Sequence, residues 1–256
     1  MRALLLTLCF LAASVARAAH PSVPLEVRAA DGEGIPALVL EPEGAAANPP
    51  VAVLLHGLTR SKEDWLADAA PTYGGALTEH LLRSGYRVYL MDARRHGARL
   101  TPDAKPGALA KRAHAGDTAP YQAMIVDTVK DAQALLARVL ATGKPPRVLV
   151  AGYSMGAQVA LLLASREPRV THLVTMVPPH VDPVLGDAAP VNRMSGIRQD
   201  WLLLTATRDT FSTAEQNQAL FEAAPGKRKT RRAFDSGHAL PREYLDEVRR
   251  WLAETK

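Results

Sequence analysis

Residues 152–156 read Gly-Tyr-Ser-Met-Gly and follow directly on an apolar, β-branched run at 147–151. A pattern of small residues typical of a helix begins at Met155. A serine on a sharp turn from strand to helix holds its hydroxyl clear of the sheet, and flanking glycines permit the strained backbone. The first N–H groups of such a helix also point toward the hydroxyl. Taken alone, this segment is equally compatible with an ordinary loop between a strand and a helix.

A base and an acid that could activate Ser154 occur later in the chain. A serine hydroxyl is a poor nucleophile at neutral pH and needs a base within hydrogen-bond reach. A histidine can take and return the proton, and a carboxylate fixes the tautomer of that histidine. Asp209 and His238 each stand on a loop after a predicted strand, so the chain order is Ser154, Asp209, His238. These three residues are the predicted nucleophile, acid and base.

Other acids and histidines could compete for these roles. Asp182 also follows a predicted strand and is the second candidate for the acid. Asp235, three residues before His238, is interpreted as a turn residue. Most other histidines are interpreted as surface or structural residues, and His180 is expected to line the pocket.

A second loop is expected to complete the site. The residues Leu55-His56-Gly57-Leu58 follow the first central strand. A glycine there lets the backbone turn and leaves the N–H of Leu58 free to point into the site. Together with the N–H of Met155, it would form a two-donor oxyanion hole. His56 is interpreted as a structural residue that holds this loop.

Short apolar runs alternate with helical patterns, which predicts buried parallel strands covered by helices on both faces. In such sheets, sites form at the carboxyl ends of the strands. The segment 25–40 reads as two strands around a hairpin turn. Further strands are predicted at 51–55, 88–91, 148–151, 172–177, 201–206 and 230–234, and helices at 75–83, 121–140, 155–166, 213–223 and 242–254.

Two connections are long enough to matter for the site. Residues 97–120 form the longest irregular connection and are expected to be a surface loop or small lid. Residues 178–200 could hold a short helix but not a large cap domain.

The first 18 residues read as a secretory signal peptide. A short basic start precedes an apolar stretch at 3–15 and the cleavage signal Ala16-Arg17-Ala18. The apolar stretch is short for a bilayer span, which needs about 20 residues. Residues 19–256 would then form a single catalytic domain, secreted or periplasmic, with no membrane span. Because Cys9 is the only cysteine, the mature chain would have no disulfide and no cysteine nucleophile.

The charge of the chain gives little indication of a nucleic-acid partner. The formal net charge is +5, and removal of residues 1–18 leaves +3. Part of this excess is one run at 227–232, interpreted as a solvated loop and edge strand, because no aromatic residues or nucleic-acid motif accompany it. No histidines and acids occur at metal-ligand spacing. No nucleic-acid partner, metal or organic cofactor is therefore predicted, and the sequence leaves the oligomeric state open.

In the order of these motifs the chain resembles the α/β-hydrolase family, on its serine esterase and dienelactone-hydrolase-like branch. The resemblance covers roughly residues 25–256. It includes the stretch Asp92-Ala93-Arg94-Arg95-His96-Gly97, in which Arg95 stands where glycine is usual. The family implies a mostly parallel eight-stranded sheet. It also implies Ser154 as nucleophile, His238 as base, Asp209 as its partner, and Leu58 and Met155 as oxyanion donors.

The expected reaction proceeds through an acyl-enzyme on Ser154, with a small carboxylic ester as substrate. A peptidase of the prolyl-oligopeptidase type or a thioesterase is the alternative, since specificity lies in pocket loops rather than in the fold. Dienelactone hydrolases usually employ cysteine, where this chain has Ser154. A more distant alternative is a non-catalytic exported binding protein on the same scaffold.

Overall fold

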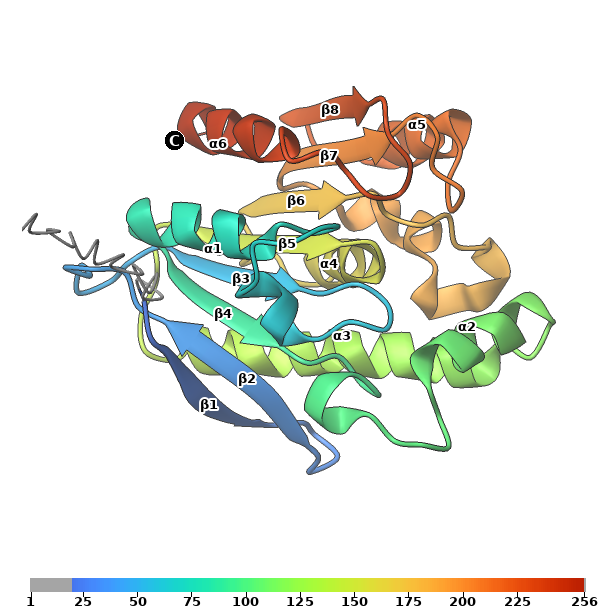
Figure 1. The fold of residues 1–256 in the computed structure, drawn as a ribbon, viewed down its shortest axis with the longest axis horizontal. Helices are drawn as coiled ribbons and strands as arrows, with labels where there is room; N and C mark the ends of the chain where they lie inside the picture. Colours follow the sequence, from blue (N-terminus) through green and yellow to red (C-terminus); the bar gives the residue numbers. More distant parts are fainter. Residues whose placement is uncertain (1–19, 256) are drawn as a thin grey trace, which may run out of the picture.

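Eight strands form one sheet in the computed structural model, which describes residues 20–255 (Figure 1). The spatial order of the strands is β1-β2-β4-β3-β5-β6-β7-β8. The pairs β1–β2 and β2–β4 are antiparallel, and every other pair is parallel. The strands are β1 (Ser22–Arg28), β2 (Gly34–Leu40), β3 (Val51–Leu55), β4 (Arg87–Met91), β5 (Val148–Tyr153), β6 (His172–Met176), β7 (Asp200–Ala206) and β8 (Lys229–Phe234).

Helices cover both faces of this sheet, as predicted. The α-helices are α1 (Gly74–Arg83), α2 (Pro106–His114), α3 (Ala119–Leu140), α4 (Met155–Ala164), α5 (Ala214–Ala223) and α6 (Tyr244–Glu254). Four short 3₁₀ helices are η1 (Lys62–Trp65), η2 (Gly97–Arg99), η3 (Pro183–Ala188) and η4 (Pro190–Gly196). The fold is thus the predicted α/β-hydrolase architecture.

The core consists of two apolar layers, one on each side of the sheet. Side chains of β3 alternate between them: Val53 belongs to the layer that includes α3 and α4, whereas Leu54 belongs to the layer that includes α1 and α6. All residues of β3, β5, β6 and β7 are buried. A strand buried on both faces has a continuous run of apolar residues in its sequence, and the positions of these four strands could therefore be predicted from the sequence.

Strand register brings the carboxyl ends of the central strands together. Leu55 at the end of β3 pairs with Gly152 of β5, and Ala206 at the end of β7 pairs with Phe234 at the end of β8. The loops that carry the candidate site residues therefore leave one edge of the sheet side by side.

The segment 97–120 is not an irregular loop throughout, which corrects the sequence-based expectation. It contains η2 and the helix α2. Of the residues in α2, only Pro106 and Leu109 are buried, so the helix has a weak apolar period in the sequence. The segment 178–200 forms η3 and η4 and no cap domain, as expected.

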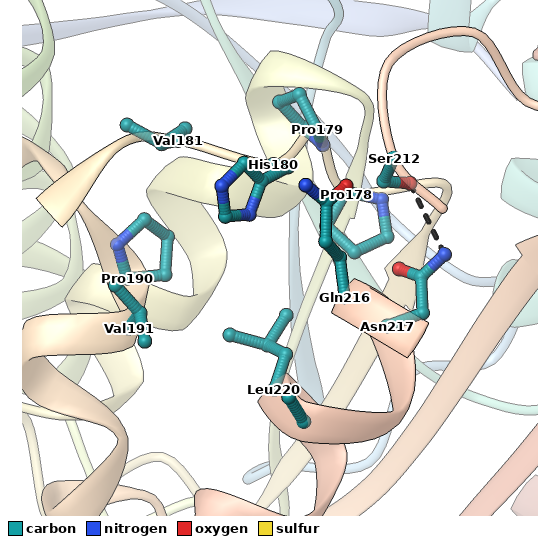
Figure 2. Close-up of a pocket in the computed structure, with 11 residues that line it drawn as sticks. Pro178, Pro179, His180, Val181, Pro190, Val191, Ser212, Gln216, Asn217 and Leu220 are labelled. Atoms are coloured by element: carbon teal, nitrogen blue, oxygen red, sulfur yellow. Dashed lines mark hydrogen bonds between the residues drawn. The ribbon is translucent and has the colours of Figure 1, made fainter. Parts of the chain in front are cut away.

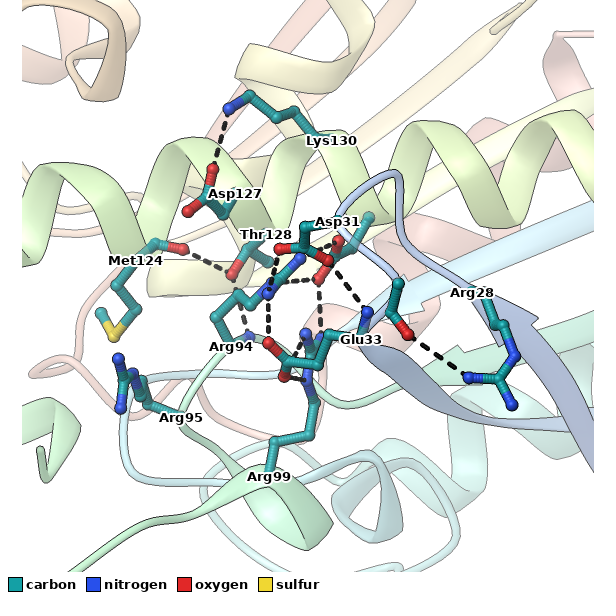
Figure 3. A network of polar contacts seen from close by, with 12 residues as sticks. Arg28, Asp31, Glu33, Arg94, Arg95, Arg99, Met124, Asp127, Thr128 and Lys130 are labelled. Atoms are coloured by element: carbon teal, nitrogen blue, oxygen red, sulfur yellow. Dashed lines mark hydrogen bonds and ion pairs between the residues drawn. The ribbon is translucent and has the colours of Figure 1, made fainter.

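A buried ionic network fastens the β1–β2 hairpin to α3 (Figure 3). The fully buried carboxylate of Asp131 accepts two hydrogen bonds from Arg94, at 2.6 and 2.8 Å, and one from Arg99 at 2.7 Å. Arg99 Nε also donates to Glu33 in the hairpin turn at 2.7 Å. Arg94 and Arg99 both belong to the segment after β4, so these charge-assisted hydrogen bonds tie that segment to α3.

Arg95, the departure from the family pattern, retains the backbone conformation that glycine favours. Its φ is 65°, in the left-handed region. The side chain is exposed and donates to Thr101 Oγ1 at 3.2 Å. Arg95 therefore adopts in this turn a backbone conformation that glycine reaches more easily.

The basic run at 227–232 forms a loop and the edge strand β8, as interpreted from the sequence. Two of its cations have local partners: Arg228 Nε lies 2.7 Å from Asp200 Oδ1, and Lys229 Nζ donates to the carbonyl of Ala224 at 2.7 Å.

The predicted signal peptide, residues 1–18, lies outside the described residues. Within residues 20–255, no helix combines the length and apolar character needed to cross a bilayer.

Candidate active site

Ser154 occupies the turn between β5 and α4 in a conformation that non-glycine residues rarely adopt. Its φ is 55° and its ψ is −118°. Backbone hydrogen bonds hold the turn: Ser154 N donates to the carbonyl of Met176 at 2.9 Å, and its own carbonyl accepts from Ala157 N at 2.8 Å. The side chain takes no part in these bonds, so its hydroxyl is free to act elsewhere.

The two glycines of the motif are required by close packing. A Cβ at Gly152 would overlap the carbonyl of Gly156, and a Cβ at Gly156 would overlap the carbonyl of Leu55. The helix can therefore begin this close to β3 only because neither position carries a side chain. This close approach brings Ser154 next to the loop that follows β3.

The structure brings Ser154, His238 and Asp209 into one hydrogen-bonded chain. Ser154 Oγ lies 2.8 Å from His238 Nε2, and His238 Nδ1 lies 3.0 Å from each carboxylate oxygen of Asp209. The Asp209 side chain is 1% exposed and that of His238 is 25% exposed. A buried carboxylate on Nδ1 favours the tautomer in which Nε2 can accept the serine proton.

The two competing acids lie elsewhere. Asp182 Oδ1 accepts from Val184 N at 2.8 Å and caps the start of η3. Asp235 is exposed and pairs with Arg208. Only Asp209, of these three acids, contacts the imidazole of His238.

Two residues that support His238 escaped the sequence analysis. Tyr153 Oη donates to the carbonyl of His238 at 3.0 Å and accepts from Leu240 N at 2.9 Å. Burial raises the pKa of Tyr153 to about 12, which keeps this hydroxyl neutral and able to donate. The ring centre of Phe211 lies 4.5 Å from that of the His238 imidazole. The backbone N–H of Phe211 donates to Asp209 Oδ1 at 2.8 Å. Tyr153 was visible as the residue before the serine, but nothing in the sequence indicated its partner.

The loop after β3 lies beside Ser154, since a Cβ at Gly57 would stand 3.6 Å from Ser154 Cβ. Among the described residues, no acceptor takes the N–H of Leu58 or of Met155. Two donors that are not used by the fold suit a developing oxyanion.

His56 holds this loop, as the sequence suggested. Its Nδ1 donates to the carbonyl of Gly57 at 2.9 Å, and its Nε2 accepts from Ala93 N at 3.1 Å. A further anchor is Lys62, whose N and Nζ each donate to the buried carboxylate of Asp92 at 2.9 Å. The loop is therefore tied to the end of β4 at two points.

Acid is expected to destabilise the protein between about pH 6.5 and pH 4. Burial lowers the pKa of His96 to about 4 and also lowers the pKa of His56, whose ring lies 5.1 Å away. Above the usual histidine pKa of about 6.5, these side chains are neutral in both the folded and the unfolded protein. Below it the unfolded state binds more protons, so the free energy of unfolding falls, by about 3 kcal/mol for His96 alone.

Urea unfolding at pH 7 and pH 4.5 measures this effect. The variant His96→Gln should show a shallower pH dependence, because glutamine does not titrate. His114→Gln, at an exposed position, is the matched control and should behave as the wild type. If the free energy of unfolding fell as much between pH 7 and pH 4.5 in His96→Gln as in the wild type, the effect could not be assigned to His96.

A cavity lies between the segment after β6, η4 and α5 (Figure 2), and its lining includes Ser212, which follows Phe211 in the chain. His180 is among the residues that line it. No cluster of three or more metal-ligating side chains occurs in the described part of the chain.

The fold and the site define a class of α/β protein with a serine held at a strand-to-helix turn beside a histidine. The sequence profile of the Alpha/beta hydrolase family matches residues 52–254, and the chain belongs to this family. No curated protein matches the chain.

Several solved structures share the fold. The esterase Pf2001 of Pyrococcus furiosus is similar at a TM-score of 0.69 and 19% identity, over 93% of each chain. Acetyl xylan esterase 1 from Thermoanaerobacterium sp. gives 0.70 and 20%, over 92% of this chain and 83% of that one. The acylaminoacyl peptidase of Pyrococcus horikoshii gives 0.70 and 11%, over 91% of this chain and 41% of that one.

Proposed function

We propose that this protein is a serine hydrolase that cleaves small carboxylic esters through an acyl-enzyme intermediate. The observation that carries the proposal is the hydrogen-bonded chain from Ser154 Oγ through His238 to Asp209, at 2.8 and 3.0 Å. Similarity of the fold to esterases, and membership of a hydrolase family, support it.

In the proposed reaction, Ser154 Oγ attacks the ester carbonyl while His238 Nε2 takes its proton. The carbonyl oxygen becomes an oxyanion that accepts hydrogen bonds from the N–H groups of Leu58 and Met155. His238 then protonates the departing alcohol. Water repeats the cycle on the acyl-serine, which releases the carboxylic acid and restores the hydroxyl. Asp209 holds the imidazole in the required tautomer throughout.

A small ester is the favoured substrate because the connection between β6 and β7 consists of η3 and η4 alone. These short helices leave the carboxyl edge of the sheet without a large cap in the described residues. A peptidase of the acylaminoacyl or prolyl-oligopeptidase type is the second candidate, supported by the fold match to the peptidase of Pyrococcus horikoshii. A thioester would be cleaved by the same chemistry.

The test combines covalent labelling with a substrate series. A serine-directed fluorophosphonate should label Ser154, and p-nitrophenyl esters from acetate to palmitate should be hydrolysed fastest at acetate or butyrate. Labelling without ester turnover would favour the peptidase, to be examined with aminoacyl amides. A folded protein that resists the fluorophosphonate and hydrolyses nothing would instead favour a binding protein.

A further inference from the structure

The cavity beside the site has walls from three separate parts of the chain. Its volume is about 110 Å³, and it is partly open to solvent. Residues 178–181 after β6 form one wall, Pro190 and Val191 of η4 a second, and Leu220 of α5 a third. In Figure 2 the side chains of His180, Pro190 and Leu220 face the same space. This volume is below that of pockets for drug-sized ligands, about 300–1,000 Å³, and leaves room only for a small group.

The first wall of the cavity is connected directly to the candidate site. His180 N donates to the carbonyl of Phe211 at 2.8 Å, and the ring of Phe211 packs on His238. On the other side, the turn at Ser154 is bonded to Met176, two residues before the wall begins. The cavity is therefore joined to His238 through Phe211.

The wall after β6 is rigid. Pro178 and Pro179 have fixed φ angles and few rotamers. Val177, just before them, has a φ of 43°, a conformation that a β-branched residue seldom adopts. Its N–H is held by the carbonyl of Leu204 at 2.8 Å. Backbone strain of this kind gathers at functional sites, and the two prolines and His180 that follow Val177 line the cavity.

Three polar side chains at the cavity are engaged by the scaffold, whereas the imidazole of His180 faces the cavity. Asn217 Nδ2 donates to Ser212 Oγ at 3.1 Å. Gln216 Oε1 accepts from the N–H of Thr213 at 2.8 Å, as part of the cap of α5. The remaining lining is mostly proline, valine and leucine, and the cavity has no carboxylate, lysine or arginine in its lining. Such a lining suits an uncharged apolar group.

We propose that this cavity binds a short aliphatic chain of the substrate and thereby sets its chain-length preference. The inference rests on the proposed ester hydrolysis, and deepens it by naming the group that is selected. The chain could belong to the acyl or the alcohol part of the ester, which share this chemistry.

Two variants should change the chain-length preference for ester substrates in opposite directions. Val191→Trp places a large ring at the cavity rim, and should lower the ratio of kcat/KM for p-nitrophenyl butyrate over acetate about tenfold. Leu220→Ala enlarges the cavity and should move the optimum to longer chains. Val184→Trp is the matched control, since Val184 is 69% exposed in the neighbouring η3 and does not line the cavity. It should leave the ratio unchanged.

A second series decides which part of the ester occupies the cavity. The acyl series keeps p-nitrophenol constant, and the alkyl series uses acetate esters from methyl to hexyl. If the chain-length preference shifts in Val191→Trp and Leu220→Ala for the acyl series, the acyl part occupies the cavity. If it shifts for the alkyl series, the alcohol part does. Unchanged preferences in both series, in variants that still react with fluorophosphonate at the wild-type rate, would overturn the proposal.

Binding without turnover separates this inference from the proposed function. In Ser154→Ala protein, 1-hexanol should produce saturable amide NMR shifts at His180, Val191 and Leu220, and weaker shifts when Val191→Trp is added. This result would support the cavity as an apolar site even if the protein hydrolysed no ester. Absence of these shifts at saturating hexanol would count against the cavity whatever the ester assays show.

Discussion

Ser154→Ala is expected to lower kcat for p-nitrophenyl acetate by about 10⁴- to 10⁶-fold, with no loss of folding. The hydroxyl is the group 2.8 Å from His238 Nε2, and no other side chain stands in for it. The turn itself is held by backbone bonds to Met176 and Ala157, which alanine retains. Steady-state kinetics and thermal unfolding of the same preparations measure both effects.

Ser165→Ala is the matched control for this variant. Ser165 lies at the opposite end of α4, and its hydroxyl donates to the carbonyl of Leu162 at 2.9 Å. Its turnover should stay within about twofold of the wild type, as expected of a substitution away from the site. Activity retained by Ser154→Ala, in protein from a host lacking background esterase, would exclude Ser154 as the nucleophile.

Asp209→Asn is expected to reduce kcat by about 10⁴-fold, as in the best-studied triad of this kind. An asparagine amide facing His238 Nδ1 favours the tautomer that carries its proton on Nε2, which can no longer accept the proton of Ser154. The amide oxygen can still accept from Phe211 N, which now donates to Asp209 Oδ1. The fold should therefore persist, and circular dichroism beside the kinetic assay checks this.

Asp182→Asn distinguishes the two candidate acids. Asp182 caps η3 through Val184 N, and asparagine caps a helix about as well as aspartate. Turnover and stability should both remain close to the wild type. A large loss of turnover in Asp182→Asn, with none in Asp209→Asn, would reverse the assignment of the acid.

The predicted features that the structure confirms are those with a local cause. The strands β3 and β7 read as continuous apolar runs because both of their faces are buried. The turn at Ser154 is visible because Gly152 and Gly156 are needed for close packing within a few residues. The hairpin before β3 carries its own turn residues, 31–34.

The features missed by the sequence analysis depend on contacts with distant segments. α2 has only two buried residues, so its helical period is faint. Tyr153 supports His238 across 85 residues of chain. Phe211 packs on the imidazole of His238 through an aromatic contact that no pattern in the sequence indicates.

The sequence by itself determined the order of the elements, the turn that presents Ser154 and the small set of residues able to serve as base and acid. These follow from burial and from backbone geometry, which short segments encode. Only the tertiary structure decided that Asp209, rather than Asp182, contacts His238. Pairing of Ala206 with Phe234 brings the loops after β7 and β8 together, whereas Asp182 turns away to cap η3. A hydrogen bond extends about 3 Å, and such distances between remote residues are set by strand order and packing.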